Sequence, residues 1–316
     1  MLSLIQLKFR RMNPEHLIIT PDRSVWWMSS HVSSAFLMAP DNSEMSDILK
    51  LIVTGRCKRG MSRLGEITLN YNRETQAISL KEISESPLIE LGELGTFDHR
   101  GMSYPFFIEH KKQSFLFYSG WKLTLDTKFE NNLGLLKFDK TQKKWRRISR
   151  APIFPLDNID PLGIGSVTLT FNDHDQLYYM FYTSFLSWKS AGNHEYTVRL
   201  ARTKNLVNWE KSKKTLIQNN DELHSICRAN FFSESIVVCA RGSQYSLYQL
   251  KTKVSLHNLF NESISISEFQ KITPKVKEKG FSEEQSYPHI SNVFGKTFLL
   301  FNGSGFGKSG LCIKGL

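Results

Sequence analysis

The sequence predicts an all-β protein, a five-bladed β-propeller with four antiparallel strands in each blade. The first observation behind this prediction is a strand pattern that recurs about every 62 residues, because a fixed period marks repeat architectures. The second is that no helical periodicity of useful length competes with the strands. The third is a composition of 40% hydrophobic and 22% charged residues, which excludes disorder, collagen and coiled coil.

Each repeat is built around an apolar strand that ends in a small or polar residue. When Thr54, Ser119, Thr183, Ala240 and Asn302 are taken as equivalent ends, the steps between them are 65, 64, 57 and 62 residues. Further strands surround this one. They are expected before it at 104–109, 166–171 and 229–232, after it at 133–138 and 197–202, and in fourth place near Trp145 and Trp209.

The last repeat stops at its third strand, at residues 309–314. An N-terminal segment, either 4–9 or 16–20, is expected to fill the vacant edge and close the ring, because an unpaired strand edge invites aggregation. No linker divides the chain, so residues 1–316 are expected to form a single domain.

Charge and cysteine usage limit the partners. The 41 Lys and Arg residues exceed the 30 Asp and Glu residues, which permits an anionic partner, but no basic stripe with interleaved aromatics predicts nucleic-acid binding. The four cysteines lie far apart, so neither a disulfide framework nor a zinc site is indicated, and no cofactor is expected.

No apolar run in the sequence reaches the roughly 18 residues of a membrane span. We expect a cytoplasmic protein, and the sequence leaves its oligomeric state open.

Acidic residues precede three of the expected innermost strands: Asp98, Asp160 and Glu283. Since innermost strands line the axis of a propeller, these carboxyl groups are expected to converge in an axial pocket. Glycoside hydrolysis needs a carboxylic acid and a second carboxylate, which suggests Glu283 as general acid, Asp98 as base or nucleophile, and Asp160 as modulator of pKa and orientation. Ordinary turn chemistry is the alternative for each aspartate.

Cationic and aromatic residues lie beside the same strand ends. Arg56, Arg228 and Arg241 are expected to bind a carboxylate, phosphate or pair of sugar hydroxyls, with internal ion pairs as the alternative. Trp121 and Trp188 follow equivalent strands, where an indole either stacks on a sugar ring or packs in the blade core.

Several short motifs carry a resemblance to a known superfamily. They include Phe-Asp-His-Arg-Gly at 97–101, Phe-Tyr-Ser-Gly-Trp at 117–121, Tyr287-Pro288 and a blade ending at 203–210. Over nearly its whole length the chain resembles the five-bladed propeller glycosidases of the arabinanase, levansucrase and invertase type. It is more closely similar to a bacterial branch encoded with surface-polysaccharide genes.

The resemblance implies a glycoside hydrolase-like enzyme of bacterial surface-polysaccharide (O-antigen-like) metabolism, and it adds His31 and Tyr287 to the expected substrate-binding residues. The chain departs from the pattern in its first blade. Cys57 stands where relatives tend to carry Asp, and the nearest candidates for the early Asp of the glycosidases are His31 and Asp41. Two alternatives therefore stay open: a non-catalytic carbohydrate-binding propeller, and a phosphorylase or transferase that uses a sugar phosphate.

Overall fold

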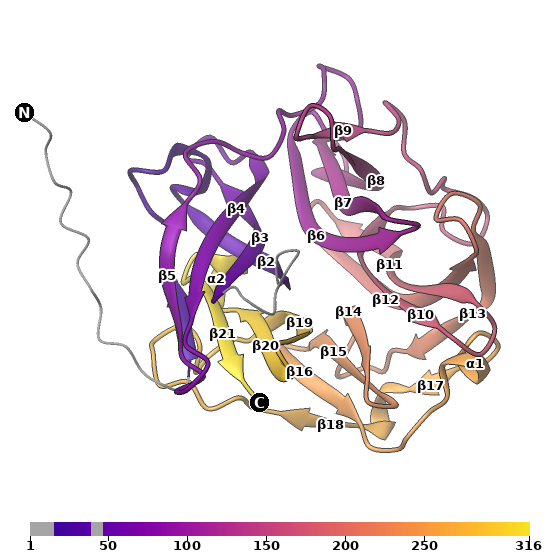
Figure 1. The fold of residues 1–316 in the computed structure, drawn as a ribbon. Helices are drawn as coiled ribbons and strands as arrows, with labels where there is room; N and C mark the ends of the chain where they lie inside the picture. The colour runs from indigo at the N-terminus through magenta and orange to yellow at the C-terminus, as the bar shows by residue number, and fades with distance from the viewer. Residues whose placement is uncertain (1–15, 39–46) are drawn as a thin grey trace, which may run out of the picture.

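The computed structural model describes residues 16–38 and 47–316, and they form an almost entirely β structure (Figure 1). The α-helices in this part of the chain, α1 (Leu256–Leu259) and α2 (Ser304–Gly307), have four residues each. Short 3₁₀ turns occur at Trp26–Met28 and Ile266–Glu268. No helix among the described residues is long and apolar enough to cross a membrane.

Most of the strands fall into sets of four antiparallel neighbours, taken in chain order. The first two sets are β2 (His31–Met38), β3 (Ile48–Arg56), β4 (Ser62–Tyr71) and β5 (Ile78–Ile83), then β6 (Gly101–His110), β7 (Gln113–Leu123), β8 (Phe129–Asp139) and β9 (Lys144–Arg147). The next two are β10 (Ile164–Asn172), β11 (Leu177–Ser190), β12 (Asn193–Thr203) and β13 (Glu210–Gln218), then β14 (Ser225–Phe232), β15 (Ser235–Arg241), β16 (Tyr245–Leu250) and β18 (Phe269–Ile272). Short parallel bridges join neighbouring sets into larger sheets, and β17 (Ile264–Ser265) pairs with β13.

The last sheet has the order β1-β21-β20-β19. It combines β19 (Ser286–Val293), β20 (Lys296–Asn302) and β21 (Leu311–Gly315) with the N-terminal strand β1 (His16–Ile19). The β1 strand pairs antiparallel with β21, from His16 opposite Lys314 to Ile19 opposite Leu311. This is the pairing that the sequence predicts for residues 16–20; the other predicted segment, 4–9, lies outside the described residues.

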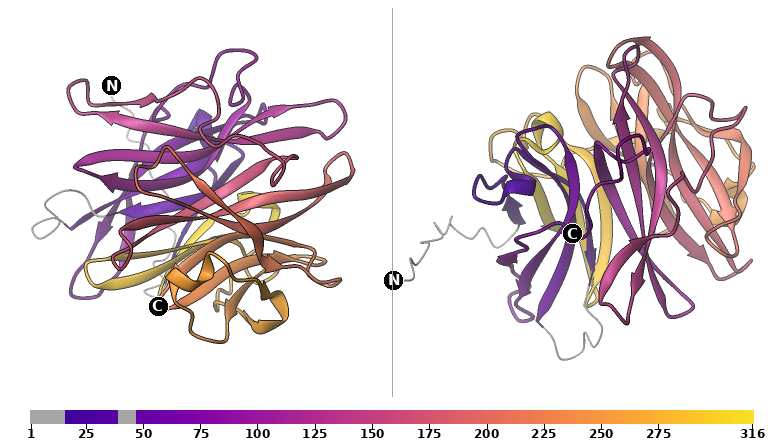
Figure 2. Two further views of the ribbon diagram at one scale, coloured as in Figure 1. Left: turned by 90° about the vertical axis from the view of Figure 1, so that its right-hand side faces the viewer. Right: turned by 90° about the horizontal axis from the view of Figure 1, so that it is seen from above.

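The first strands of the sets surround the centre of the molecule (Figures 1 and 2). Strand β2 contacts β6, β6 contacts β10, β10 contacts β14, β14 contacts β19, and β19 contacts β2. Within each set the strands are antiparallel, so the start of the first strand, the end of the second and the start of the third lie at one end. We call this the strand-start end of the molecule.

Each first strand carries a bulge near its start. The regular pairing with the second strand is interrupted between Ser33 and Phe36, and equivalent interruptions occur in β6, β10, β14 and β19. Four of these bulges hold a non-glycine residue with positive φ: Ser34 at 42°, Tyr104 at 57°, Arg228 at 51° and Tyr287 at 52°. Bulges re-aim side chains, and the left-handed conformation is costly for such residues. The repeated bulge therefore directs selected side chains around the axis.

Candidate functional site

Asp98 is buried, with 1% of its surface exposed, and its carboxylate is fully engaged. Tyr118 donates its hydroxyl to Oδ2 at 2.9 Å, Arg147 donates Nε to the same oxygen at 2.7 Å, and Thr96 donates its hydroxyl to Oδ1 at 3.1 Å. Tyr118 lies in β7 and Arg147 in β9, the second and fourth strands of the set that Asp98 precedes. Asp98 thus links β7 and β9 of its own set through hydrogen bonds.

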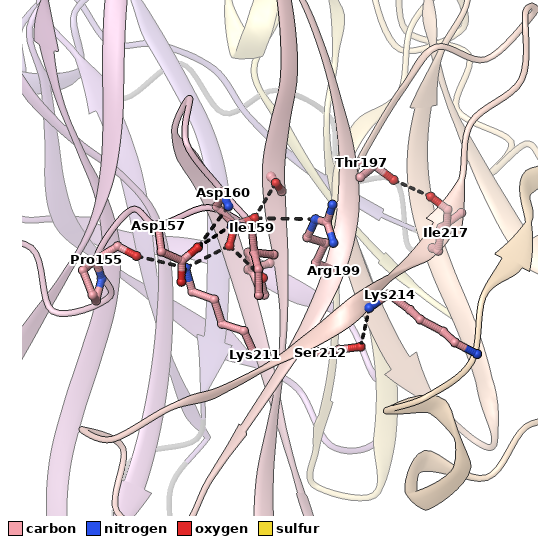
Figure 3. Close-up of polar contacts among 12 residues, drawn as sticks. Pro155, Asp157, Ile159, Asp160, Thr197, Arg199, Lys211, Ser212, Lys214 and Ile217 are labelled. Atoms are coloured by element: carbon pink, nitrogen blue, oxygen red, sulfur yellow. Dashed lines mark hydrogen bonds and ion pairs between the residues drawn. The ribbon is translucent and has the colours of Figure 1, made fainter.

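Asp160 occupies the corresponding place in the next set and is fully buried. Figure 3 shows its polar contacts. Tyr182 and Ser184 donate hydroxyls to it at 3.0 and 2.6 Å, and Lys211 Nζ lies 2.9 Å from Oδ2. Lys211 also pairs with Asp157 at 3.0 Å, and Arg199 Nε is 3.6 Å from Oδ1. The triad of aspartate, tyrosine and cation therefore occurs twice.

This placement bears on the expectation that Asp98 and Asp160 act on a substrate. Each carboxylate is inaccessible and paired with a cation from the fourth strand of its own set. A buried carboxylate in such a pair is a structural element whose charge is already neutralised. Both aspartates form internal ion pairs, and their partners are Arg147 and Lys211, not Arg56, Arg228 or Arg241.

Glu283 is exposed at the surface, and the half-buried carboxyl at this point of the chain is its neighbour Glu284. Burial raises the pKa of Glu284, although the backbone N–H of Gly305 donates to Oε2 at 3.4 Å. A raised pKa keeps a carboxyl protonated nearer neutral pH, which is the property of a general acid. The sequence argument named Glu283 as the general acid, and the structure shows that the more buried carboxyl of this loop belongs to Glu284.

Four tyrosines from four different sets meet at the strand-start end: Tyr104 in β6, Tyr196 in β12, Tyr245 in β16 and Tyr287 in β19. We call them the tyrosine cluster. The rings of Tyr104 and Tyr287 stack with centroids 4.8 Å apart, those of Tyr245 and Tyr287 lie 5.8 Å apart, and Tyr196 and Tyr245 share a hydrogen bond between hydroxyls. Burial raises the pKa of all four phenols, so they remain neutral hydroxyls.

Cations lie at two places around the tyrosine cluster. On one side, Arg56 ends β3 opposite His31, and Lys308 follows α2, which packs against β2. Burial, reinforced by Arg56 and Lys308, lowers the pKa of His31 to about 4, so this imidazole is neutral at pH 7. On the other side, the guanidinium of Arg241 lies over the rings of Tyr196 and Tyr245, at 5.8 and 5.4 Å.

Arg228 differs from the other two arginines that the sequence singled out. Its side chain is 1% exposed and donates to the carbonyl oxygens of Val167 at 2.8 Å and Pro105 at 3.1 Å. It therefore links β14 to β10 and β6 through backbone carbonyls. This is a structural role, in place of the substrate contact that we expected.

The two tryptophans and Tyr287 also have defined places. Trp188 packs in an aromatic group, stacked on Phe185 at 5.6 Å and edge-on to Phe129 at 5.1 Å, which favours the packing alternative for its indole. Trp121 is half-buried against Gly101, where an added Cβ would come within 1.9 Å of its Nε1. Tyr287 belongs to the tyrosine cluster, and Asp41 lies outside the described residues.

A cavity of about 340 Å³ opens at the opposite ends of the first strands. Phe36, Phe106, Phe231 and His289 are among its lining residues, and no Asp, Glu, Lys or Arg of the described part of the chain is. The described lining therefore supplies no acid for glycoside chemistry, whereas the strand-start end carries Glu284. Among residues 16–38 and 47–316 no group of three or more His, Cys, Asp or Glu side chains is placed to hold a metal ion.

Sequence reasoning missed Glu284, Tyr104, Tyr245 and Lys308 as members of one site. The signal for two of the tyrosines was present, because Tyr104 and Tyr287 each precede a proline at the start of a first strand. The bulge that turns them was not visible in the sequence, since it depends on the register with the second strand.

Comparison with known proteins supports the fold and leaves the family undecided. No family model matches the chain. The chain is 26% identical over 300 residues to "Uncharacterized protein Rv1502" of Mycobacterium tuberculosis, covering 93% of this chain and 95% of that protein.

Among solved structures, one reported for "The GH130 family of mannoside phosphorylases contains glycoside hydrolases that target beta-1,2 mannosidic linkages in Candida mannan" has a TM-score of 0.65 at 14% identity, covering 98% and 95% of the two chains. A glycosyl hydrolase from Bacteroides ovatus has a TM-score of 0.64 at 14% identity, covering 97% of this chain and 92% of that one. The GH32 β-fructofuranosidase BmSUC1 of Bombyx mori has a TM-score of 0.61 at 15% identity, covering 96% and 64%. The chain therefore shares the fold of the propeller glycoside hydrolases.

Proposed function

We propose that this protein is a glycoside hydrolase-like enzyme that binds a sugar over the tyrosine cluster, with Glu284 as the general acid. The observation that carries the proposal is a half-buried carboxyl of raised pKa at the strand-start end of a fold shared with glycoside hydrolases. Neutral tyrosine hydroxyls suit sugar hydroxyls, and the ring of Phe306, 44% exposed beside Tyr245 and Tyr287, offers a face for stacking.

In the proposed reaction, Glu284 gives its proton to the leaving glycosidic oxygen, and a nucleophile attacks the anomeric carbon. Because burial raises the pKa of Glu284, the acid form persists to higher pH than for an exposed glutamate. Turnover should decline as the pH rises through that pKa, since the carboxylate has no proton to donate.

A non-catalytic carbohydrate-binding protein is the second candidate. The observation that favours it is the engagement of Asp98 and Asp160, the two aspartates expected to act with the general acid, in internal ion pairs. A phosphorylase or transferase that uses a sugar phosphate needs one carboxylate fewer than a hydrolase, because phosphate itself acts as the nucleophile.

We further infer that the sets of strands are the five blades of a propeller and that β1 closes the ring. The cycle of contacts among the five first strands and the pairing of β1 with β21 support this inference.

We also propose a cytoplasmic location and a substrate from bacterial surface polysaccharide. Free, buried Cys57, Cys227, Cys239 and Cys312 suit a reducing compartment, and the motif resemblance supports the substrate.

Replacement of Glu284 by Gln tests the catalytic proposal. The chain supplies a matched control in Glu283→Gln, one residue away and exposed. On a panel of methyl glycosides and bacterial surface oligosaccharides, Glu284→Gln should lower kcat by about 10²- to 10⁴-fold, while Glu283→Gln leaves it unchanged. The loss should be smaller with nitrophenyl glycosides, whose leaving group needs little protonation.

Two outcomes would contradict this assignment. Equal losses in the two variants would show that the proton comes from elsewhere. Saturable binding by calorimetry without turnover of any glycoside by the unmodified protein would favour the carbohydrate-binding candidate.

A further inference from the structure

The cations around the tyrosine cluster lack carboxylate partners among the described residues. Arg241 donates Nη2 to the carbonyl oxygen of His194 at 2.9 Å and to the Ser225 hydroxyl at 3.2 Å, and its buried Nε has no partner in the described part of the chain. Arg56 donates Nε to the Ser62 hydroxyl at 3.2 Å. Lys308 is exposed and forms no ion pair with a described carboxylate.

Elsewhere in the molecule, several cations at comparable depth pair with carboxylates, whereas the buried Arg228 is held by backbone carbonyl oxygens. Arg147 pairs with Asp98 at 2.7 Å, Arg202 with Glu210 at 2.7 Å, and Lys211 with Asp157 and Asp160. Half-buried charges without partners are costly, so their retention at one end indicates a function in binding rather than in folding.

The unpaired cations occupy two separate positions. Arg56 acts electrostatically on Tyr104, whereas Arg241 lies over Tyr196 and Tyr245 and acts on Tyr287. Tyr104 and Tyr287 stack on each other, so the two arginines belong to the surroundings of one pair of rings. Cations at two places around one cluster suit a chain of sugars that carries a carboxylate on more than one ring.

We propose that the glycan bound at the strand-start end is acidic, with carboxylate groups that pair with Arg241 on one side of the tyrosine cluster and with Arg56 and Lys308 on the other. The planar guanidinium groups offer bidentate hydrogen bonds to a carboxylate. The half-buried Tyr104 and the exposed ring of Phe306 contact the sugar rings between these carboxylates. This inference rests on the proposed carbohydrate site but does not depend on Glu284 or on catalysis.

The test compares matched acidic and neutral sugars by calorimetry. Oligosaccharides of galacturonic, glucuronic and mannuronic acid are set against oligosaccharides of galactose, glucose and mannose with the same linkages. At least one acidic member should bind about tenfold or more tightly than its neutral counterpart, and its affinity should fall between about 50 and 500 mM NaCl because salt screens the charges.

Charge-removing variants locate the contacts. Arg241→Gln, Arg56→Gln and Lys308→Gln should each weaken binding of the acidic sugar by about 10- to 100-fold and that of the neutral sugar by less than about twofold. Lys308 is exposed, so its variant keeps the fold. The control is Arg146→Gln, which removes the same charge from a side chain of β9 that pairs with Asp139, and it should change neither affinity.

Equal affinity for the acidic and neutral members of every pair would overturn the inference and leave the carbohydrate site standing. Tight binding of inorganic phosphate or a hexose 1-phosphate, with phosphate-dependent turnover of a neutral sugar, would also overturn it and assign the cations to phosphate. If the folded protein binds no member of any pair, the inference and the proposed function both fail.

Discussion

At the residue scale, Asp98 and Asp160 are carboxylates that the sequence suggested as catalytic and that form buried hydrogen bonds and ion pairs within their own sets of strands. Each accepts a tyrosine hydroxyl and faces a cation from its own set of strands. Aspartate, tyrosine and cation recur in the order Asp98, Tyr118, Arg147 and Asp160, Tyr182, Lys211, at intervals of 62 to 64 residues. The repeat of the sequence is thus also a repeat of internal ion pairs.

Replacing either aspartate by asparagine should destabilise the protein by about 3–5 kcal/mol, because a buried cation loses its counter-charge. Urea denaturation of Asp98→Asn and Asp160→Asn measures this, with exposed Asp126→Asn as a control that should change stability by less than about 0.5 kcal/mol. If either variant keeps full stability and loses turnover, the catalytic role that the sequence suggested is restored.

At the scale of elements, the repeated bulge in the first strands shapes the centre of the molecule. Arg228 adopts a φ of 51° at the bulge of β14, and its side chain reaches carbonyl oxygens in β10 and β6. An arginine that donates to carbonyls of two other strands joins three first strands at one point. Tyr104 and Tyr287 occupy the equivalent bulges of β6 and β19 and turn into the tyrosine cluster.

Arg228→Met keeps much of the side-chain volume but removes both donors. Two buried carbonyl oxygens then lose a partner, and the free energy of unfolding should fall by about 2–4 kcal/mol. Thermal denaturation compares this variant with Arg150→Met, whose side chain is 76% exposed and should tolerate the change. A stability loss below about 0.5 kcal/mol would mean that Arg228 does not join these strands, and a role in binding would have to be reconsidered.

At the scale of the whole molecule, the first and last described strands form one sheet. Ile19 of β1 is 3% exposed and belongs to the same core as Trp27, Val53 and Leu300. The N-terminal strand therefore shares a core with the first and the last set of strands, which fits a ring closed between chain ends. The pairing with β1 also protects the edge of β21.

Ile19→Ala should cost about 2–4 kcal/mol, the range for a large-to-small change in a core. If β1 closes the ring, the loss appears in one cooperative unfolding transition, seen alike by circular dichroism and tryptophan fluorescence. Leu17→Ala, at a half-buried position of the same strand, should cost less. A separate early transition of β1 alone would argue against ring closure.

The sequence alone determined the order of the strands and their period, because a fixed repeat of strand patterns can be read along the chain. It offered 4–9 and 16–20 as alternatives for the last sheet, and the structure shows the pairing of His16–Ile19. It also placed Arg56, Arg241 and Tyr287 at one end of the molecule. Only the tertiary structure decided which carboxyl groups are free. The burial of Asp98 and Asp160 depends on cations 49 and 51 residues further along the chain, and the orientation of the tyrosines depends on bulges set by strand register. The sequence gives the charge of each side chain, but the partner of that charge is determined by how distant strands pack together.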